Sequence, residues 1–268
     1  MLMGNTDLLL NHVVVLAKQA GHAILEVYGR TDFGVRHKAD HSPLTEADLA
    51  AHRVITEGLQ QLTPDIPVLS EESAASAIAD RGRWSRFWLV DPLDGTKEFI
   101  NRNGEFTVNI GLVDGHYPVL GVVHVPAQER CYFANTRLGA FRQYASEPPV
   151  PINALRNATP PLRVVSSRSH PGPELATIVR NLGEHTLVPM GSAVKCCLVA
   201  EGSADFYPRL SPTWWWDTAA AQCVAESAGA HVVDTHGQRL SYNRSDELRN
   251  PPFVVYADTD RNWLAALP

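Results

Sequence analysis

Two stretches near the start of the chain carry apolar residues at helical spacing. In residues 6–28 apolar side chains recur every three or four positions, and Gly29 follows as a suitable C-terminal stop. Thr45 is a good N-cap for a second helix, which the same spacing predicts as far as residue 62. Apolar positions at these intervals place one apolar stripe along a helix. We therefore expect two amphipathic helices in this part of the chain.

Shorter apolar runs, separated by turn residues, predict a series of strands. One run leads into Glu71, and another, at residues 88–90, leads into Asp91. The pair Asp114-Gly115 is a hairpin signal between two β-rich runs. Further strands are expected at 107–112, 121–125, 131–133, 139–142, 162–166, 186–188, 204–207 and 253–256, and further helices at 173–182, 193–200 and 218–228. The pattern is that of a mixed α/β chain.

The segment from Glu147 to Pro161 is polar and rich in proline, which is typical of a boundary between structural units. We expect an N-terminal α+β lobe over residues 1–155 and a C-terminal α/β lobe over residues 156–268. A chain of 268 residues has room for one large domain or two small ones.

Composition narrows the class of protein. A hydrophobic content of 44% with 19% charged residues predicts a globular chain with a sizeable core. The net charge of −6 argues against non-specific nucleic-acid binding, so an anionic substrate must be attracted locally by metals and a few basic residues. The four cysteines lack metal-type spacing and predict buried thiols in a reducing compartment. We recognise no signal peptide or membrane-spanning segment and expect a cytoplasmic protein, with peripheral contact at the inner membrane left open.

Two carboxylates follow the run at residues 88–90. Asp91 and Asp94 lie three residues apart, Pro92 favours extended backbone before it, and Gly95 permits a tight turn. Two like charges this close either raise a pKa or bind a cation. Carboxylate oxygens suit a hard divalent ion, Mg²⁺ before Zn²⁺. The structural alternative is a helix N-cap formed by Asp94 and the two residues after it.

Two further acidic positions lie where one element gives way to another. Glu71 and Glu72 follow an apolar strand end, and Asp217 follows three tryptophans and precedes a helix of small residues. Open sheets bind ligands at the carboxyl ends of their strands. Three acidic segments that meet there would form a multi-metal site.

The three acidic stretches together resemble the inositol monophosphatase superfamily of phosphatases. In chain order they are Glu71-Glu72, Asp91-Pro-Leu-Asp-Gly-Thr96 and Trp216-Asp-Thr-Ala-Ala220. The resemblance covers about residues 17–256 and implies the layered αβαβα sandwich of the inositol monophosphatase and fructose-1,6-bisphosphatase-like phosphatases. Further stretches, at 38–48, 95–109, 167–170 and 191–209, are similar to those of bacterial 3'(2'),5'-bisphosphate nucleotidases.

The resemblance implies two or three Mg²⁺ ions in an oxygen-lined cage. The implied ligands are the side chains of Glu71, Asp91, Asp94 and Asp217, with the backbone carbonyl of Leu93. A water molecule activated by the metal would then attack phosphorus in line, without a covalent intermediate.

Catalytic roles are expected for Glu71, Thr96 and Asp48. The Thr96 hydroxyl can orient or relay a water toward Glu71 or Asp48, whereas helix capping is its structural alternative. Asp48 stands in the first turn of the second predicted helix, where an acid is ordinarily stabilising. The resemblance alone places it in the water and metal network, together with a polar loop at residues 38–42 that resembles a mobile loop closing on a further metal.

The matched segments also imply a substrate site. The expected contacts are Glu71, Leu93, Asp94, Gly95, Thr96, Ser169, His170, Ser192, Lys195, Arg209 and Asp217. A solvated helix lysine and a surface arginine are the structural alternatives for Lys195 and Arg209. The tryptophans before Asp217 suit nucleobase stacking, but the family places Trp216 in the core and leaves Trp214 and Trp215 without an assigned role.

The implied reaction is removal of the 3'-phosphate of adenosine 3',5'-bisphosphate, giving AMP. The resemblance extends to 3'-phosphoadenylyl sulfate as a substrate, to sulfate assimilation and to inhibition by lithium. The first alternative is hydrolysis of inositol 1-phosphate or another sugar phosphate, and the second is a non-catalytic metal or nucleotide sensor. The expected partner is the nucleotide alone, without nucleic acid or an integral membrane segment, bound to a monomer or a homodimer.

Overall fold

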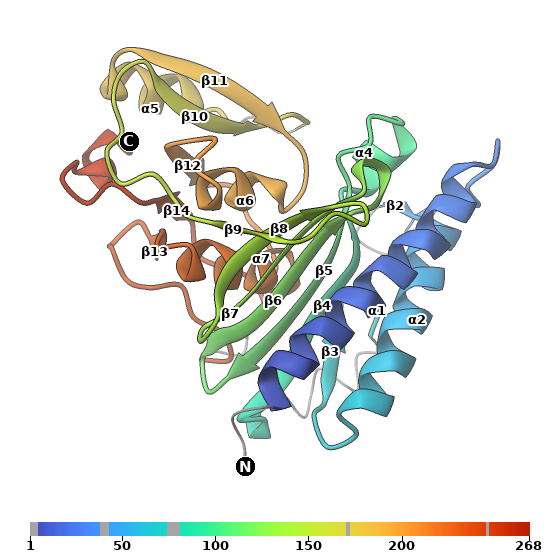
Figure 1. Ribbon diagram of the computed structural model, residues 1–268. Helices are drawn as coiled ribbons and strands as arrows, with labels where there is room; N and C mark the ends of the chain where they lie inside the picture. The colour runs from blue at the N-terminus through green and yellow to red at the C-terminus, as the bar shows by residue number, and fades with distance from the viewer. Residues whose placement is uncertain (1–4, 38–42, 74–80, 170–171, 245–246) are drawn as a thin grey trace.

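The chain folds into five layers (Figure 1). Helices α1 (Asn5–Tyr28) and α2 (Glu46–Leu62) cover one face of a seven-stranded sheet. Helices α6 (Val194–Ala200) and α7 (Trp215–Ser227) lie between this sheet and a five-stranded sheet, and α5 (Leu175–Leu182) lies on the far side of the second sheet. The α/β sandwich is therefore confirmed. The computed structural model describes residues 5–37, 43–73, 81–169, 172–244 and 247–268.

The seven-stranded sheet has the order β3-β4-β5-β6-β7-β8-β9. Strands β3 and β4 are parallel, and every later neighbour pair is antiparallel. The bounds are β3 Val68–Ser70, β4 Arg86–Asp94, β5 Thr107–Asp114, β6 Tyr117–Val125, β7 Arg130–Asn135, β8 Gly139–Tyr144 and β9 Val150–Ile152. A ribbon of β1 (Arg36–His37) and β2 (Pro43–Leu44) and the short helix α4 (Thr96–Ile100) complete this half.

The five-stranded sheet has the order β11-β10-β12-β14-β13. Strand β10 is parallel to β11 and β12, whereas β14 is antiparallel to β12 and β13. The bounds are β10 Leu162–Ser167, β11 His185–Met190, β12 Phe206–Arg209, β13 His231–Asp234 and β14 Phe253–Tyr256. Short 3₁₀ helices lie at Arg81–Arg83, Pro126–Gln128 and Trp263–Ala266.

Helix α7 approaches the first sheet closely because both surfaces carry small residues. A Cβ atom at Gly111 of β5 would lie 2.9 Å from the backbone nitrogen of Ala220, and one at Gly121 of β6 would collide with the Ala220 carbonyl oxygen. Glycine on the strands and alanine on the helix let the two backbones meet. This packing holds the first turn of α7, which carries Asp217, against the first sheet.

Helix α1 owes its apolar character to the core. Residues 7–28 are long and apolar enough to span a membrane, and no other helix among the described residues is. Leu10, Val13, Ala17 and Ile24 of this helix are buried in the core between α1, α2 and the first sheet. In this structure the segment is therefore one of the core helices.

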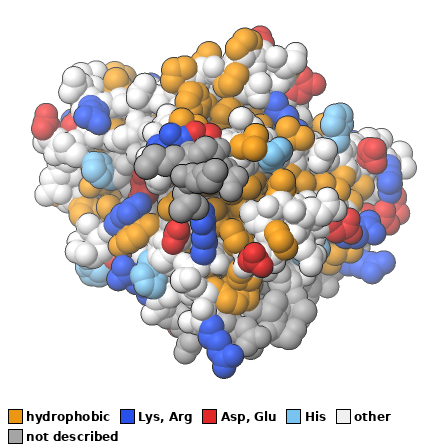
Figure 2. Space-filling model, turned by 60° about the horizontal axis from the view of Figure 1, so that its bottom comes forward, with side chains coloured by type: hydrophobic (Ala, Val, Ile, Leu, Met, Phe, Trp, Pro, Cys, Tyr) orange, Lys and Arg blue, Asp and Glu red, His pale blue; other side chains and the backbone are white. Residues whose placement is uncertain are grey.

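The surface carries mixed charge on the face seen in Figure 2. Lysine, arginine, aspartate and glutamate side chains alternate there with apolar ones. Neither sign forms a large continuous area among the described residues on this face.

Most predicted elements are confirmed, and the differences have physical reasons. Strand β4 runs on to Asp94, where the sequence predicted an end at residue 90, because a β-bulge lets its pairing with β5 continue. Helix α7 begins at Trp215 and not at residue 218. Strands β9 and β13 were missed, and both are edge strands. Pro151 is tolerated in β9 because an edge strand needs fewer backbone donors.

The predicted lobe boundary falls in the connection between the two sheets. Strand β9 closes the first sheet at residue 152, and β10 opens the second at residue 162. Helix α7, although it belongs to the second half of the chain, packs on strands of the first sheet. The division of the chain at residue 155 therefore stays a prediction.

Candidate active site

A polar cavity of about 300 Å³ lies where β4, α4, α6, β12 and α7 come together. Most of the predicted site residues line it, although they come from distant parts of the chain. They are Glu71, Asp91, Leu93, Asp94, Gly95, Thr96, Ser192, Lys195, Arg209 and Asp217. The fold therefore brings the acidic segments of the first half together with the basic residues of the second.

The parallel pairing of β3 with β4 places Glu71 beside Asp91. Ser70 pairs with Val90, and the backbone N–H of Glu71 donates to the Val90 carbonyl at 3.0 Å. The next residue on each strand is therefore a carboxylate at the same sheet end. Asp91 is buried, and its Oδ1 accepts the backbone N–H of Leu93 at 3.0 Å.

The bulge in β4 brings Asp94 into the same cavity. Asp91 pairs with Asn109 and Asp94 with Thr107, so one more residue lies on β4 than on β5 between the two pairs. The Asp94 Oδ2 atom lies 3.4 Å from Asn109 Nδ2 and 3.5 Å from Thr107 Oγ1, its two donors on β5. The extra residue is what lets two acids three positions apart share one cavity.

The chain turns sharply after Asp94. Gly95 has φ of +89°, a left-handed conformation that glycine adopts without strain, and it caps the N-terminus of α4. The Thr96 hydroxyl lies 3.5 Å from the Leu93 carbonyl oxygen and donates to it. The turn therefore holds the Leu93 carbonyl and the Thr96 hydroxyl at one edge of the cavity.

Asp217 lies in the first turn of α7, on the face of the first sheet opposite α1 and α2, and reaches the cavity from there. Its Oδ2 accepts the backbone N–H of Trp214 at 2.8 Å, which caps the helix and explains why α7 starts earlier than predicted. Trp214 and Trp216 stack with ring centroids 5.5 Å apart, and Trp215 and Trp216 are buried. The predicted core position of Trp216 is confirmed, and the tryptophan cluster does not line this cavity.

The clustered carboxylates raise one another's pKa. Burial is the main cause of the raised pKa of Asp91, and the charges of Glu71, Asp94 and Asp217 add to it. Burial also raises the pKa of Asp217 well above 3.8, with Asp94 as the next cause. Burial raises the pKa of Asp94 as well, although Lys195 opposes the effect. These acids therefore disfavour the ionised form unless positive charge is supplied.

The donor set fits a hard divalent cation. Five carboxylates line the cavity together with Leu93, and oxygen ligands are those that Mg²⁺ prefers. The Oδ1 atom of Asn109, whose Nδ2 lies 3.4 Å from Asp94 Oδ2, is buried without a hydrogen-bond partner. No three His, Cys, Asp or Glu side chains within the described ranges converge closely enough to hold an ion as they stand. Mutual repulsion is a physical reason for such spacing, and a cation would relieve it.

The basic wall of the cavity comes from the second half of the chain. Lys195 is buried at the start of α6, and its Nζ donates to the Ser192 carbonyl at 2.6 Å. Burial lowers the Lys195 pKa, and the neighbouring Asp94 partly restores it. The Ser192 hydroxyl and Arg209 Nε are buried without hydrogen-bond partners. Arg209 Nη2 lies 3.3 Å from the Pro212 carbonyl.

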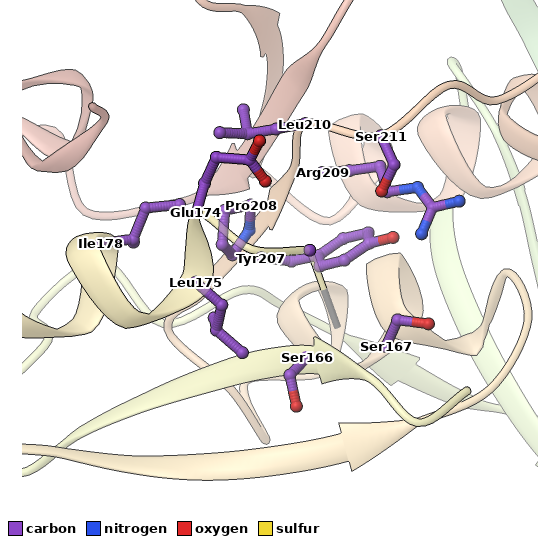
Figure 3. Close-up of a pocket in the computed structure, with 11 residues that line it drawn as sticks. Ser166, Ser167, Glu174, Leu175, Ile178, Tyr207, Pro208, Arg209, Leu210 and Ser211 are labelled. Atoms are coloured by element: carbon purple, nitrogen blue, oxygen red, sulfur yellow. The ribbon is translucent and has the colours of Figure 1, made fainter. Parts of the chain in front are cut away.

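A smaller, adjoining pocket shares two residues with this wall. Figure 3 shows this smaller pocket, which Ser167, Tyr207 and Arg209 all line. In that view Arg209 and Ser167 lie near the hydroxyl end of the Tyr207 ring. Ser167 and Arg209 line the main cavity as well. The basic wall therefore extends from the carboxylates toward the end of β10.

Two predicted site residues, Asp48 and Ser169, do not line the cavity, and a third, His170, is not described. Asp48 does not line the cavity; its Oδ2 accepts the Thr45 backbone N–H at 2.7 Å and the Thr45 hydroxyl at 2.6 Å, forming a capping box on α2. Burial raises its pKa to about 6. The Ser169 hydroxyl donates to Glu98. His170 lies outside the described residues, as does the loop at 38–42. The roles predicted for Asp48, Ser169 and His170 stay predictions.

Four lining residues were missed by sequence reasoning: Pro43, Lys97, Glu98 and Ser167. All four lie inside stretches that resemble the nucleotidases, so the segments were recognised although these positions received no role. Their positions depend on the turn after Gly95, on the end of β10 and, for Pro43, on the pairing of β2 with β1. Spacing along the chain carries no signal for any of these.

Comparisons with known proteins agree with this geometry. The model of the inositol monophosphatase family matches residues 5–260. The 3'(2'),5'-bisphosphate nucleotidase CysQ of Escherichia coli strain K12 is 50% identical over 248 residues, which cover 92% of this chain and 99% of that protein. The nucleotidase CysQ of Haemophilus influenzae is 36% identical, with 95% of each chain covered.

Solved structures show the same similarity. CysQ from Bacteroides thetaiotaomicron superposes with a TM-score of 0.80 at 41% identity, covering 92% of this chain and 97% of that one. An IMPase of Thermotoga maritima superposes with a TM-score of 0.77 at 24% identity, covering 96% of this chain and 94% of that one. The second likeness concerns the fold alone.

Proposed function

The chain belongs to the inositol monophosphatase family, and within it we propose that the protein removes the 3'-phosphate of adenosine 3',5'-bisphosphate to give AMP and phosphate. The observation that carries the proposal is one cavity with two unlike walls, an acidic one for cations and a basic one for a second phosphate. The nucleotidases at 50% identity favour this substrate. The sulfated relative 3'-phosphoadenylyl sulfate presents the same ester and is a further proposed substrate.

The acidic wall would hold two or three Mg²⁺ ions. Glu71, Asp91, Asp94 and Asp217, with the Leu93 carbonyl, are the proposed ligands. Bound Mg²⁺ supplies positive charge to the phosphoryl oxygens and the leaving oxygen and makes a nearby water more acidic. Metal dependence is general in this family, which agrees with acids that need positive charge to stay ionised.

The remaining chemistry falls to residues beside these ligands. We propose that the Thr96 hydroxyl, which donates to the Leu93 carbonyl, accepts a hydrogen bond from the attacking water and orients it, and that Glu71 receives the proton of the water. Proton transfer by a positioned group contributes about 10²–10⁴ to a rate. Asp48 is the second proposed proton acceptor. Burial raises its pKa, and the charges of Glu72 and Glu71 raise it further. We infer direct attack by water, with no covalent phosphoenzyme.

The basic wall would select the substrate. Lys195 and Arg209 can pair with the second phosphate, Arg209 through a planar guanidinium and Lys195 as a point charge. The buried hydroxyl of Ser192 can donate to the same group. Inositol 1-phosphate, the alternative substrate, has no second phosphate and would leave these donors unused.

Phosphate release measures both parts of the proposal. Purified protein is assayed with adenosine 3',5'-bisphosphate and with inositol 1-phosphate, across a Mg²⁺ titration and with Li⁺. We expect Mg²⁺-dependent release, inhibition by Li⁺ and a preference for the bisphosphate. An inositol 1-phosphate preference would overturn the substrate, and no release from either would favour the non-catalytic sensor.

The remaining proposals concern the setting of the protein. Free, buried cysteines at all four positions suit the reducing cytoplasm. The nucleotidase relatives favour the same location, and nothing in them supports peripheral contact with the inner membrane. A monomer and a homodimer both remain compatible with the fold.

A further inference from the structure

Two acidic side chains of the first half of the chain bind the second half beside the active site. Glu105 accepts two hydrogen bonds from Arg168, at 2.7 Å from Nε and 2.6 Å from Nη2. It also accepts the backbone N–H of Gly191 at 2.8 Å. Glu98 accepts the hydroxyl of Ser169. We call these five residues, Glu98, Glu105, Arg168, Ser169 and Gly191, the carboxylate clasp.

The clasp is tightly packed as well as hydrogen-bonded. Glu98 and Glu105 are 6% and 8% exposed, so both carboxylates need hydrogen-bond partners within the protein. A Cβ atom at Gly191 would lie 2.7 Å from Glu98 Cγ and 2.9 Å from Glu105 Cβ. Gly191 is therefore held by both glutamates at once. Only glycine fits this contact without displacing them.

Gly191 connects the clasp to the basic wall of the cavity. The next residue, Ser192, has φ of +48° and a buried hydroxyl, and its carbonyl accepts the Lys195 ammonium group at 2.6 Å. A displacement of Gly191 would therefore move Ser192 and, through it, the Nζ atom of Lys195. Ser167, at the other end of the clasp, precedes Arg168 and also lines the cavity.

The hydrogen bonds separate the clasp from the metal ligands. Of the metal-side acids, Asp91 and Asp217 accept bonds from their own neighbourhood in β4 and at the start of α7, and Asp94 accepts bonds from β5 and from the backbone of Ala193. The clasp acids instead receive donors from segments 60 to 90 residues further along, beyond the end of β10 and before α6. Glu98 lines the cavity, but its Oε1 is engaged by Ser169. This arrangement suits a role in placing the wall and not in holding ions.

We propose that Glu98 and Glu105 are positioning residues, which hold Gly191 so that Ser192 and Lys195 face the second phosphate of the substrate. The proposal rests on the proposed function for the identity of that substrate. It gives a physical role to the stretches at 95–109, 167–170 and 191–209, because all five clasp residues lie within them. These stretches bind one another across the site.

The test compares two substrates in clasp variants. Glu105→Gln and Arg168→Lys are assayed with adenosine 3',5'-bisphosphate and with adenosine 3'-phosphate, which carries the same ester without the second phosphate. We expect KM for the bisphosphate to rise about tenfold, the size of one lost charge-assisted hydrogen bond. KM for adenosine 3'-phosphate and kcat for both substrates should stay within about twofold of wild type, because the acidic wall is unchanged.

A matched control separates positioning from stability. Arg239 and Glu226 form the same two-bond pair, at 2.9 and 2.7 Å, away from the cavity. Glu226→Gln should lower the melting temperature much as Glu105→Gln does but leave both KM values at wild type. The double variant Glu105→Gln with Arg168→Lys should raise KM no more than the larger single change, because both act through one contact.

The binding of AMP, measured by calorimetry without Mg²⁺, gives a second readout. AMP keeps the 5'-phosphate, and we expect its affinity to fall about tenfold in Glu105→Gln, as one charge-assisted bond predicts. Equal losses for both substrates, or KM values matching those of Glu226→Gln, would overturn the positioning role. Wild-type protein that ignores the bisphosphate would instead defeat the proposed function, and the clasp proposal with it.

Discussion

Buried carboxylates occur in two neighbouring regions of this molecule and behave differently. On the acidic wall, the buried Asp91 and the half-buried Asp217 have few donors, and desolvation and one another's charges raise their pKa. In the clasp, Glu105 is almost as buried but receives two guanidinium bonds and a backbone N–H. One region needs positive charge from outside the chain, and the other has it from Arg168.

Whether the protein supplies partners for a carboxylate distinguishes a functional acid from a structural one better than its burial does. An acid whose partners are supplied by the protein stabilises the fold, because its lone pairs are satisfied. An acid grouped with other acids destabilises the fold until a cation binds, which is the usual cost of a binding site. The acidic wall and the clasp should therefore respond in opposite directions when a carboxylate is made neutral.

The largest expected effect is on the acidic wall. Asp91→Asn keeps an acceptor for the Leu93 N–H but removes a proposed metal ligand. We expect kcat/KM to fall more than about a hundredfold, since the loss of even an outer partner of a metal site costs about 10–100-fold. In EDTA the variant should melt at a higher temperature than wild type, because a repelled charge is gone.

Thermal unfolding in EDTA and steady-state kinetics check both halves of this prediction. The matched clasp variant, Glu105→Gln, should show the reverse pattern, with a lower melting temperature and an unchanged kcat. If Asp91→Asn destabilised the cation-free protein as much as Glu105→Gln, the contrast between the two regions would be wrong.

A smaller effect is expected on the basic wall. Lys195→Ala and Arg209→Ala remove the charges proposed to read the second phosphate. KM for adenosine 3',5'-bisphosphate should rise about tenfold or more, while KM for adenosine 3'-phosphate changes little, as expected for one lost charged contact. Initial-rate kinetics with the two substrates measure the ratio. Equal increases would show that these residues do not distinguish the substrates.

The smallest expected effect is on the pH dependence of the free energy of unfolding. The folded pKa of Asp48 is about 6 and that of Asp91 is higher than 3.8, so the folded state binds protons more tightly than the unfolded state. The free energy of unfolding is therefore greatest below the unfolded pKa of 3.8 as far as these groups are concerned, and falls as pH rises through the folded values.

Differential scanning calorimetry in EDTA measures this slope. From pH 5 to pH 8 we expect the melting temperature to fall by a few degrees, about what 1–2 kcal/mol produces in a chain of this size. Asp91→Asn should flatten the profile, and Mg²⁺ should remove most of the decline at pH 8. A wild-type profile that matched the Asp91→Asn profile would contradict the account.

Local patterns predicted much of the fold and the acidic wall. Helical spacing and Thr45 as N-cap predicted α2 within one residue, because capping is read from neighbours in the chain. The tight turn expected at Gly95 is confirmed, and its φ of +89° shows why glycine stands there. Glu71 and Asp91 were found at strand ends because their strands carry clear apolar runs.

Features that depend on pairing between segments could not be predicted from spacing. The bulge that brings Asp94 beside Asp91 exists only through the pairing of β4 with β5. Ser169 was expected to bind substrate, but its donation to Glu98 depends on how the two halves pack. The structure shows Asp48 in the capping box of α2, and its catalytic role stays a prediction. Contacts across 60 residues or more leave no periodic trace in a sequence.

The central claim is that four distant carboxylates form one cation site, and anomalous scattering from crystals soaked in Mn²⁺ tests it most directly. The account predicts ions in the main cavity bound by oxygens of Glu71, Asp91, Asp94 and Asp217, with the Leu93 carbonyl. Asp217→Asn should weaken or remove at least one peak. Carboxylates that point apart at saturating Mn²⁺, with no anomalous peak among them, would contradict it.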